Sequence, residues 1–107
     1  MTIAGWKVKA ELIVQATISS RTTITYKNLA ADAGIPSPHT IHQLTLFLEE
    51  LIDKDIALGL PIRAAVVVSR TNNIPGEGFF IKLADCGVLP KDGEDNASFH
   101  QRLISQL

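Results

Sequence analysis

The sequence predicts an α+β fold of the winged helix-turn-helix type. A helical pattern ends at Gly34, is followed at once by Pro36 and Pro38, and continues in a second, longer helical pattern. Two short segments rich in β-branched and aromatic residues come next, with a cluster of turn-forming residues between them. About three helices, a β-hairpin wing and a C-terminal helix would then form a single domain over residues 1–107.

The first half of the chain is predicted to form three helices. Apolar residues recur at helical spacing over residues 6–17. Thr25 can cap the second helix, because its hydroxyl can accept a hydrogen bond from a free amide of the first turn, and Gly34 suits the left-handed position after the last turn. The third helix is expected roughly over residues 39–57, before Gly59-Leu60-Pro61. Its predicted core face consists of Ile41, Leu44, Leu48, Leu51 and Ile52.

The second half of the chain predicts the wing. Residues 64–69 are rich in valine and indicate a strand buried on both faces. Residues 71–78 form a dense turn signal, and residues 79–83 are expected to be the returning strand. A polar connector over residues 88–97 then leads to an amphipathic helix over residues 98–107.

Composition indicates an ordinary globular protein. Hydrophobic residues make up 46% of the 107 residues, charged residues 20%, and the net charge is −1. The single cysteine, Cys86, excludes an internal disulfide and favours a reducing compartment. The N-terminus lacks the basic start and apolar run of a signal peptide, and the longest apolar run, residues 64–68, is too short to span a bilayer. We therefore expect a cytoplasmic protein that makes no use of a membrane.

Three short motifs carry a family resemblance. They are Tyr26-Lys27-Asn28-Leu29-Ala30, Ala33-Gly34 and Leu60-Pro61-Ile62. Over residues 6–69 the chain resembles the C-terminal domain of alkylguanine-DNA alkyltransferases and their alkyltransferase-like relatives. The resemblance implies a winged-helix domain that binds nucleic acid, with Tyr26 as the tyrosine that crowds the target phosphate.

The chain departs from this family where the chemistry should be. The position of the reactive cysteine falls at about Val66, which has no thiol to accept an alkyl group. It is also not the aromatic residue that damage-sensing relatives typically hold there. The arginine finger falls near Thr40, which has no cation to fill the gap left by a flipped base. The resemblance therefore implies a binding domain that is not an enzyme.

The first functional hypothesis is binding to duplex DNA. In a helix-turn-helix the first turns of the second helix meet base edges, while nearby cations hold phosphates. The predicted nucleic-acid-binding residues are Tyr26, His39, Thr40, His42, Gln43, Arg63, Arg70 and Lys82, the last three on or beside the wing strands. The near-neutral net charge opposes this hypothesis, since dedicated nucleic-acid binders are usually basic.

The alternative is a small protein-binding module. The outward stripe of the third helix is formed by His42, Leu46, Glu49 and Asp53, and its carboxylates are opposed in the sequence only by Lys54. An acidic surface of this kind suits a basic partner and would speed association with it. An immunity or antitoxin protein that neutralises a basic toxin nuclease through Leu46, Glu49, Glu50 and Asp53 would fit this pattern.

Other chemistry has weaker support in the sequence. His39 and His42 lie three residues apart, but no ligand spacing joins them to Cys86 or His100, so no metal site is expected. No histidine is spaced to activate Cys86 as a nucleophile. Residues 75–78 superficially resemble a phosphate loop but lack its lysine and following helix. We therefore expect no catalytic residue and no cofactor.

Overall fold

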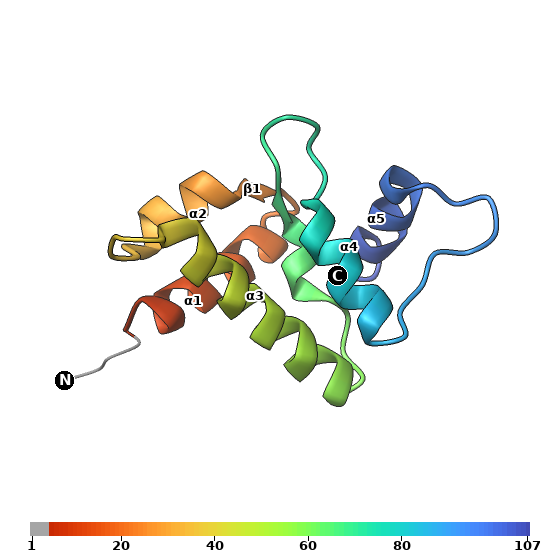
Figure 1. The fold of residues 1–107 in the computed structure, drawn as a ribbon, viewed down its shortest axis with the longest axis horizontal. Helices are drawn as coiled ribbons and strands as arrows, with labels where there is room; N and C mark the ends of the chain where they lie inside the picture. Colours follow the sequence, from red (N-terminus) through yellow and green to blue (C-terminus); the bar gives the residue numbers. More distant parts are fainter. Residues whose placement is uncertain (1–4) are drawn as a thin grey trace.

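The computed structural model describes residues 5–107 as helices packed around a very short parallel sheet. The elements are α1 (Gly5–Ser19), β1 (Ile24–Thr25), α2 (Tyr26–Ala33), α3 (Thr40–Ala57), the 3₁₀ helix η1 (Arg63–Val66), β2 (Val67–Val68), α4 (Glu77–Asp85) and α5 (Asn96–Ile104) (Figure 1). Most of the described chain is therefore helical.

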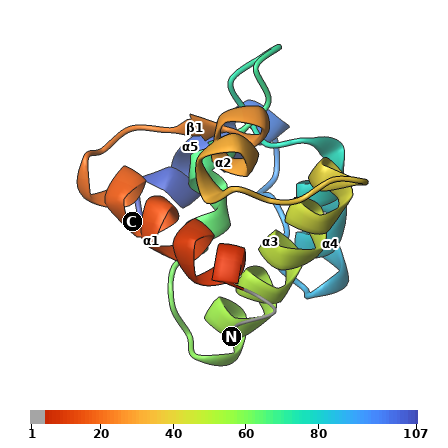
Figure 2. The same cartoon turned by 90° about the vertical axis from the view of Figure 1, so that its left-hand side faces the viewer.

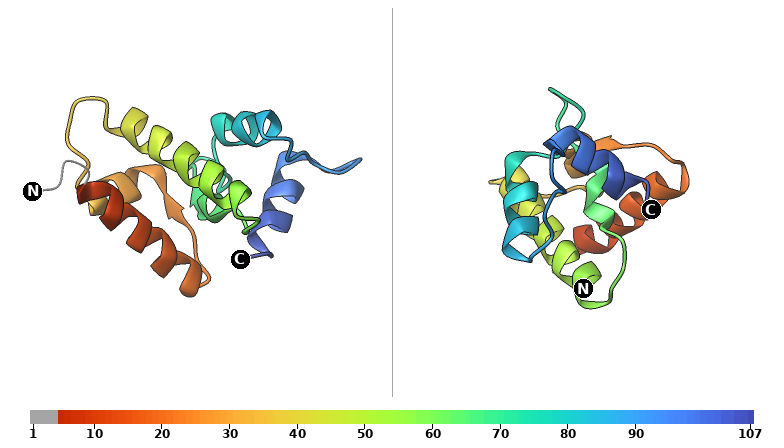
Figure 3. Two further views of the ribbon diagram at one scale, coloured as in Figure 1. Left: turned by 90° about the horizontal axis from the view of Figure 1, so that it is seen from below. Right: turned by 90° about the vertical axis from the view of Figure 1, so that its right-hand side faces the viewer.

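The hub of the core is η1 together with β2. All five residues from Ala64 to Val68 are buried. Helices α1, α3 and α5 each pack against η1, while α2 contacts α1, α3 and both strands. Helices α4 and α5 lie toward the end of the molecule away from α2, as two views show (Figures 1 and 3). One apolar cluster contains residues from all five helices.

The two strands run parallel, so their carboxyl ends lie at the same edge of the sheet. Ile24 pairs with Val67, and Thr25 pairs with Val68. Because the carboxyl ends of parallel strands meet at the same edge, α2 begins where residues 69–76 leave the sheet. The loop formed by residues 69–76 projects beyond this edge in both perpendicular views (Figures 1 and 2).

The prediction of a first wing strand over residues 64–69 is wrong for most of that segment. Residues 63–66 form η1, and only Val67 and Val68 form a strand, which pairs in parallel with β1. A continuous buried apolar run has no period that separates a strand from a tight helical turn. The carboxylate of Asp55 fixes the turn, because it accepts a hydrogen bond from the Arg63 backbone amide at 3.0 Å.

The predicted second wing strand, residues 79–83, is part of helix α4. Phe79 and Leu83, four residues apart, are both buried, whereas Ile81 between them is 55% exposed. A strand with alternating faces would have placed all three side chains on one side. Within residues 5–107 there is thus no hairpin wing, and the winged helix-turn-helix prediction is wrong.

The helices of the first half agree with the sequence prediction, except that Ile41, predicted on the core face of α3, is 48% exposed. The Thr25 hydroxyl accepts a hydrogen bond from the Asn28 amide at 3.1 Å and so caps α2. Gly34 has a φ of 71°, and its amide donates to carbonyls of the last turn. The local capping predictions are confirmed, although the overall architecture is not.

Candidate functional site

Two exposed cations lie just beyond the carboxyl edge of the sheet. Lys27 follows Thr25 by two residues, and Arg70 follows Val68 by two residues, so each comes directly after the last strand pair. Neither side chain forms an ion pair within residues 5–107. Arg70 was predicted from the sequence as a DNA contact, but Lys27 was not, because its only signal was its place beside Tyr26 at a helix start.

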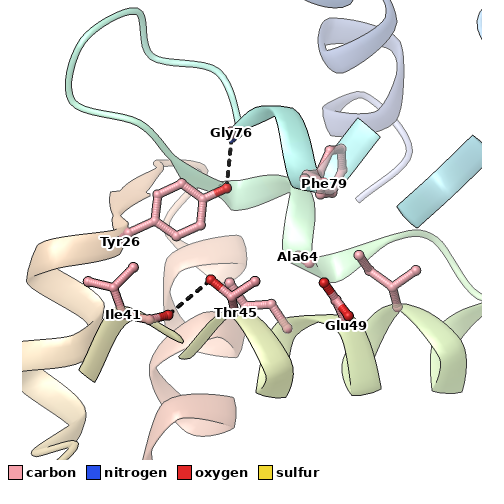
Figure 4. A pocket seen from close by; sticks show the side chains of 10 residues that line it. Tyr26, Ile41, Thr45, Glu49, Ala64, Gly76 and Phe79 are labelled. Atoms are coloured by element: carbon pink, nitrogen blue, oxygen red, sulfur yellow. Dashed lines mark hydrogen bonds between the residues drawn. The ribbon is translucent and has the colours of Figure 1, made fainter. Parts of the chain in front are cut away.

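Tyr26 joins this edge to the first turns of α3. Its hydroxyl accepts a hydrogen bond from the Gly76 amide at 2.8 Å, which holds the start of α4 against α2 (Figure 4). Its ring lines the same groove as Ile41 of α3. Burial raises the pKa of Tyr26, so the phenol stays protonated at neutral pH and its O–H remains a donor.

The first turn of α3 presents polar groups to solvent. His39 precedes the helix with a left-handed φ of 61°, and both His39 and His42 are exposed. Thr40 is half-buried, with its hydroxyl 3.5 Å from the Pro36 carbonyl oxygen. Gln43 is already engaged, because its amide donates to the carbonyls of Pro36 and Pro38 at 2.8 and 3.0 Å. Gln43 thus holds the turn before α3, while the histidines are free to contact a ligand.

Arg63 does not belong to this surface, which corrects its prediction as a wing cation. Its guanidinium lies 2.7 Å from the carboxylate of Asp55, which is fully buried, and 3.1 Å from Glu11 of α1. The hydrogen bond with Asp55 raises the pKa of Arg63. Its side chain is only 13% exposed, so it ties α1, α3 and η1 together instead of facing phosphate.

Lys82 is also placed differently from its prediction as a wing residue. It lies on α4, and its ammonium group is 2.9 Å from the Asp53 carboxylate of α3. The hydrogen bond with Asp53 raises the pKa of Lys82. The side chain joins two helices and does not extend toward the carboxyl edge of the sheet.

The acidic stripe of α3 is largely neutralised inside the molecule. Asp53 pairs with Lys82, Glu50 pairs with Lys7 of α1 at 3.0 Å, and the buried Asp55 pairs with Arg63. Among the described residues, Glu49 is the carboxylate of this helix that forms no ion pair. The surface of α3 is therefore less acidic than the excess of acidic residues in its sequence suggests.

A groove of about 220 Å³ lies between Tyr26, α3 and the start of α4. Its lining is mainly apolar, with Glu49 as its charged residue (Figure 4). The main apolar contributors are Tyr26, Ile41, Leu48, Ile52, Ala64 and Phe79. This groove was not predicted from the sequence, because Phe79 was expected on a wing strand, away from α3.

The remaining reactive side chains do not form a catalytic or metal centre. The His100 ring is buried, with Nε2 2.7 Å from the Ala65 carbonyl oxygen. The Cys86 sulfur lies 3.8 Å from an Asp53 oxygen, and no histidine contacts it among the hydrogen bonds of residues 5–107. Within the same range, no three His, Cys, Asp or Glu residues gather as they would around a metal ion. None of the described helices combines the length and apolarity needed to cross a membrane.

The candidate site therefore consists of the carboxyl edge of the sheet, the first turn of α3 and the adjoining groove. Tyr26 and Arg70 lie at the sheet edge, and His39, Thr40 and His42 lie at the start of α3. Arg63 and Lys82 lie elsewhere, in internal ion pairs. Comparison of the chain with protein-family models, with curated proteins and with solved structures found no match.

Proposed function

We propose that this chain is a non-enzymatic domain that binds duplex DNA at the carboxyl edge of its sheet. The observation that carries the proposal is the pair of exposed cations, Lys27 and Arg70, beside the starts of α2 and the loop 69–76. Neither forms an ion pair with any residue that the structure describes. Binding of such cations to DNA phosphates is favourable because it releases the counterions condensed on the DNA. The single thiol supports a cytoplasmic setting for this activity.

Each member of the surface has a distinct role in the proposal. Lys27 and Arg70 contact phosphates, and the Tyr26 hydroxyl donates a hydrogen bond to an oxygen of a third phosphate. His39 and His42 offer ring nitrogens to base edges from the first turn of α3. The resemblance to alkyltransferase-like proteins supports the role of Tyr26. Val66, at the position of that family's reactive cysteine, is buried and has no nucleophile, which supports binding without chemistry.

The internal ion pairs of α3 remove much of the electrostatic objection to this proposal. Carboxylates that face a phosphate backbone weaken binding, but Glu50 and Asp53 each contact a cation of this chain. Glu49 remains the principal opposing charge on the helix. We therefore expect weak to moderate affinity with a clear dependence on salt.

The same ion pairs weaken the alternative of an immunity or antitoxin protein. That hypothesis required Leu46, Glu49, Glu50 and Asp53 to face a basic toxin together. Two of the three carboxylates already form ion pairs with Lys7 and Lys82, so a toxin would have to displace these two lysines. Leu46, which is 49% exposed, and Glu49 remain available to a protein partner.

The test is fluorescence anisotropy with a labelled DNA duplex over a salt series from about 20 to about 150 mM. The logarithm of the association constant should fall against the logarithm of salt with a slope near −2, since each neutralised phosphate contributes about −0.9. Arg70→Ala and Lys27→Ala should each reduce the slope by about one.

The matched control is Lys91→Ala. Lys91 is exposed and lies in the connector between α4 and α5, at the far end of the molecule from α2 (Figure 1). It should leave both affinity and slope unchanged. Absence of binding at the lowest salt, or an equal loss in the Lys91 variant, would reject the carboxyl edge as a DNA site.

A further inference from the structure

The groove beside the sheet edge has the size of one large side chain. Its volume is about 220 Å³. An apolar cavity of about 150 Å³ binds benzene, and pockets for drug-sized ligands run from roughly 300 to 1,000 Å³. The groove therefore suits a single aromatic or large aliphatic group better than a cofactor.

Its walls combine an apolar lining with one negative charge. Leu48, Ile52 and Phe79 are buried residues that contribute to the lining, while Ile41 on α3 is 48% exposed. Glu49 stands on the same wall without an ion pair in residues 5–107. A bound group would thus meet apolar surface and a carboxylate together.

We propose that this groove binds a segment of a partner protein in which one aromatic or large aliphatic side chain neighbours a lysine or arginine. The apolar side chain fills the groove, and its basic neighbour pairs with Glu49. Charge complementarity favours a peptide over a nucleic-acid base, because the carboxylate attracts an ammonium or guanidinium group and repels phosphates. This inference goes beyond DNA binding and does not depend on it.

Gly78 provides a way to fill the groove without disturbing the core. It lines the groove in the first turn of α4, and a Cβ added there would meet no atom within 4 Å. A larger residue also has a higher helix propensity than glycine. Gly78→Leu should therefore keep the fold while narrowing the groove.

The experiment is a titration of ¹⁵N-labelled protein with acetyl-Phe-Lys-amide, followed by NMR. We expect progressive shifts of amides near Tyr26, Thr45 and Phe79, with a dissociation constant in the millimolar range. Gly78→Leu should abolish these shifts while its thermal midpoint stays at or above that of the unmodified protein. Glu49→Lys should weaken binding by about fivefold or more, as expected for loss and reversal of a surface charge pair.

Three controls make the proposal falsifiable. Asp92→Lys makes the same charge change in the distant connector and should leave binding intact. Equal binding of acetyl-Phe-Glu-amide would overturn the pairing with Glu49. Groove shifts with thymidine or adenosine but none with the dipeptide would identify a base as the occupant and overturn the proposal. In the DNA titration Glu49→Lys should instead strengthen binding, so the two proposals fail independently.

Discussion

Asp55 and Arg63 show that the role of a charged residue depends on the contacts that it makes. In the sequence, one belongs to an acidic helix and the other to a predicted wing. In the structure, Asp55 is fully buried and accepts hydrogen bonds from both the backbone amide and the guanidinium of Arg63. No periodicity in the sequence reveals this pairing, because it spans the end of α3 and the turn into η1.

The first prediction concerns Asp55→Ala. The substitution leaves the Arg63 guanidinium without its closest partner in a mostly buried position, so the free energy of unfolding should fall by roughly 3–5 kcal/mol. Urea denaturation followed by circular dichroism measures this change. Glu50→Ala, which breaks the more exposed pair with Lys7, should cost at most about 1 kcal/mol. Similar losses in the two variants would show that the buried pair of Asp55 with Arg63 contributes no more to stability than the exposed pair of Glu50 with Lys7.

The predictions about the candidate site were made residue by residue, from the chemistry of each side chain. His39, His42 and Arg70 are exposed and Tyr26 is half-buried, so each is accessible, as DNA binding requires. Gln43 was selected for its hydrogen-bonding capacity, but that capacity is used on the turn before α3. Residue type predicts what a side chain can do, whereas its neighbours decide whether it is free to do so.

At the scale of elements, α4 is the decisive difference between prediction and structure. The segment combines glycine, two phenylalanines and isoleucine, a composition that favours a strand after a turn. Packing against α3 overrides that preference. The helix buries Phe79 and Leu83 and leaves Ile81 exposed, whereas a strand would place all three on the same side. The glycines of residues 76–78 then begin a helix beside Tyr26 instead of closing a hairpin.

The second prediction concerns the contact that holds the start of α4. Tyr26→Phe removes the acceptor for the Gly76 amide, which is 2.8 Å from the hydroxyl. Exchange of the Gly76 amide with solvent should accelerate, and the free energy of unfolding should fall by about 1 kcal/mol. Hydrogen exchange followed by NMR measures both effects. The Gly34 amide, which bonds within the end of α2, is the internal control; an unchanged Gly76 rate would refute the role of Tyr26.

At the scale of the whole molecule, the helices share one core centred on η1 and β2. Helix α5 contributes Phe99, which is 1% exposed, and α1 contributes Trp6, which packs edge-on against Phe47 of α3. The cluster connects these distant helices through buried neighbours. The described chain should therefore unfold as one cooperative unit.

The third prediction tests this cooperativity with Phe99→Ala. Removal of the ring leaves a cavity and should lower the free energy of unfolding by roughly 3–5 kcal/mol. The fluorescence of Trp6, in α1, should report the same lowered midpoint as far-ultraviolet circular dichroism. Gln101→Ala on the exposed side of α5 should change stability by less than about 0.5 kcal/mol. Loss of helical signal before the Trp6 transition would instead mean that α5 unfolds separately.

Local features of this protein can be predicted from short stretches of its sequence. The cap at Thr25, the left-handed Gly34 and the extent of α3 follow from interactions between residues a few positions apart. Other features depend on long-range packing: the helical state of α4, the parallel pairing of β1 with β2, the ion pairs that neutralise α3, and the groove. These features join residues far apart in the sequence, such as Lys7 and Glu50, which are 43 positions apart. Their formation depends on which surfaces the packed core brings together, and local pattern carries little information about that.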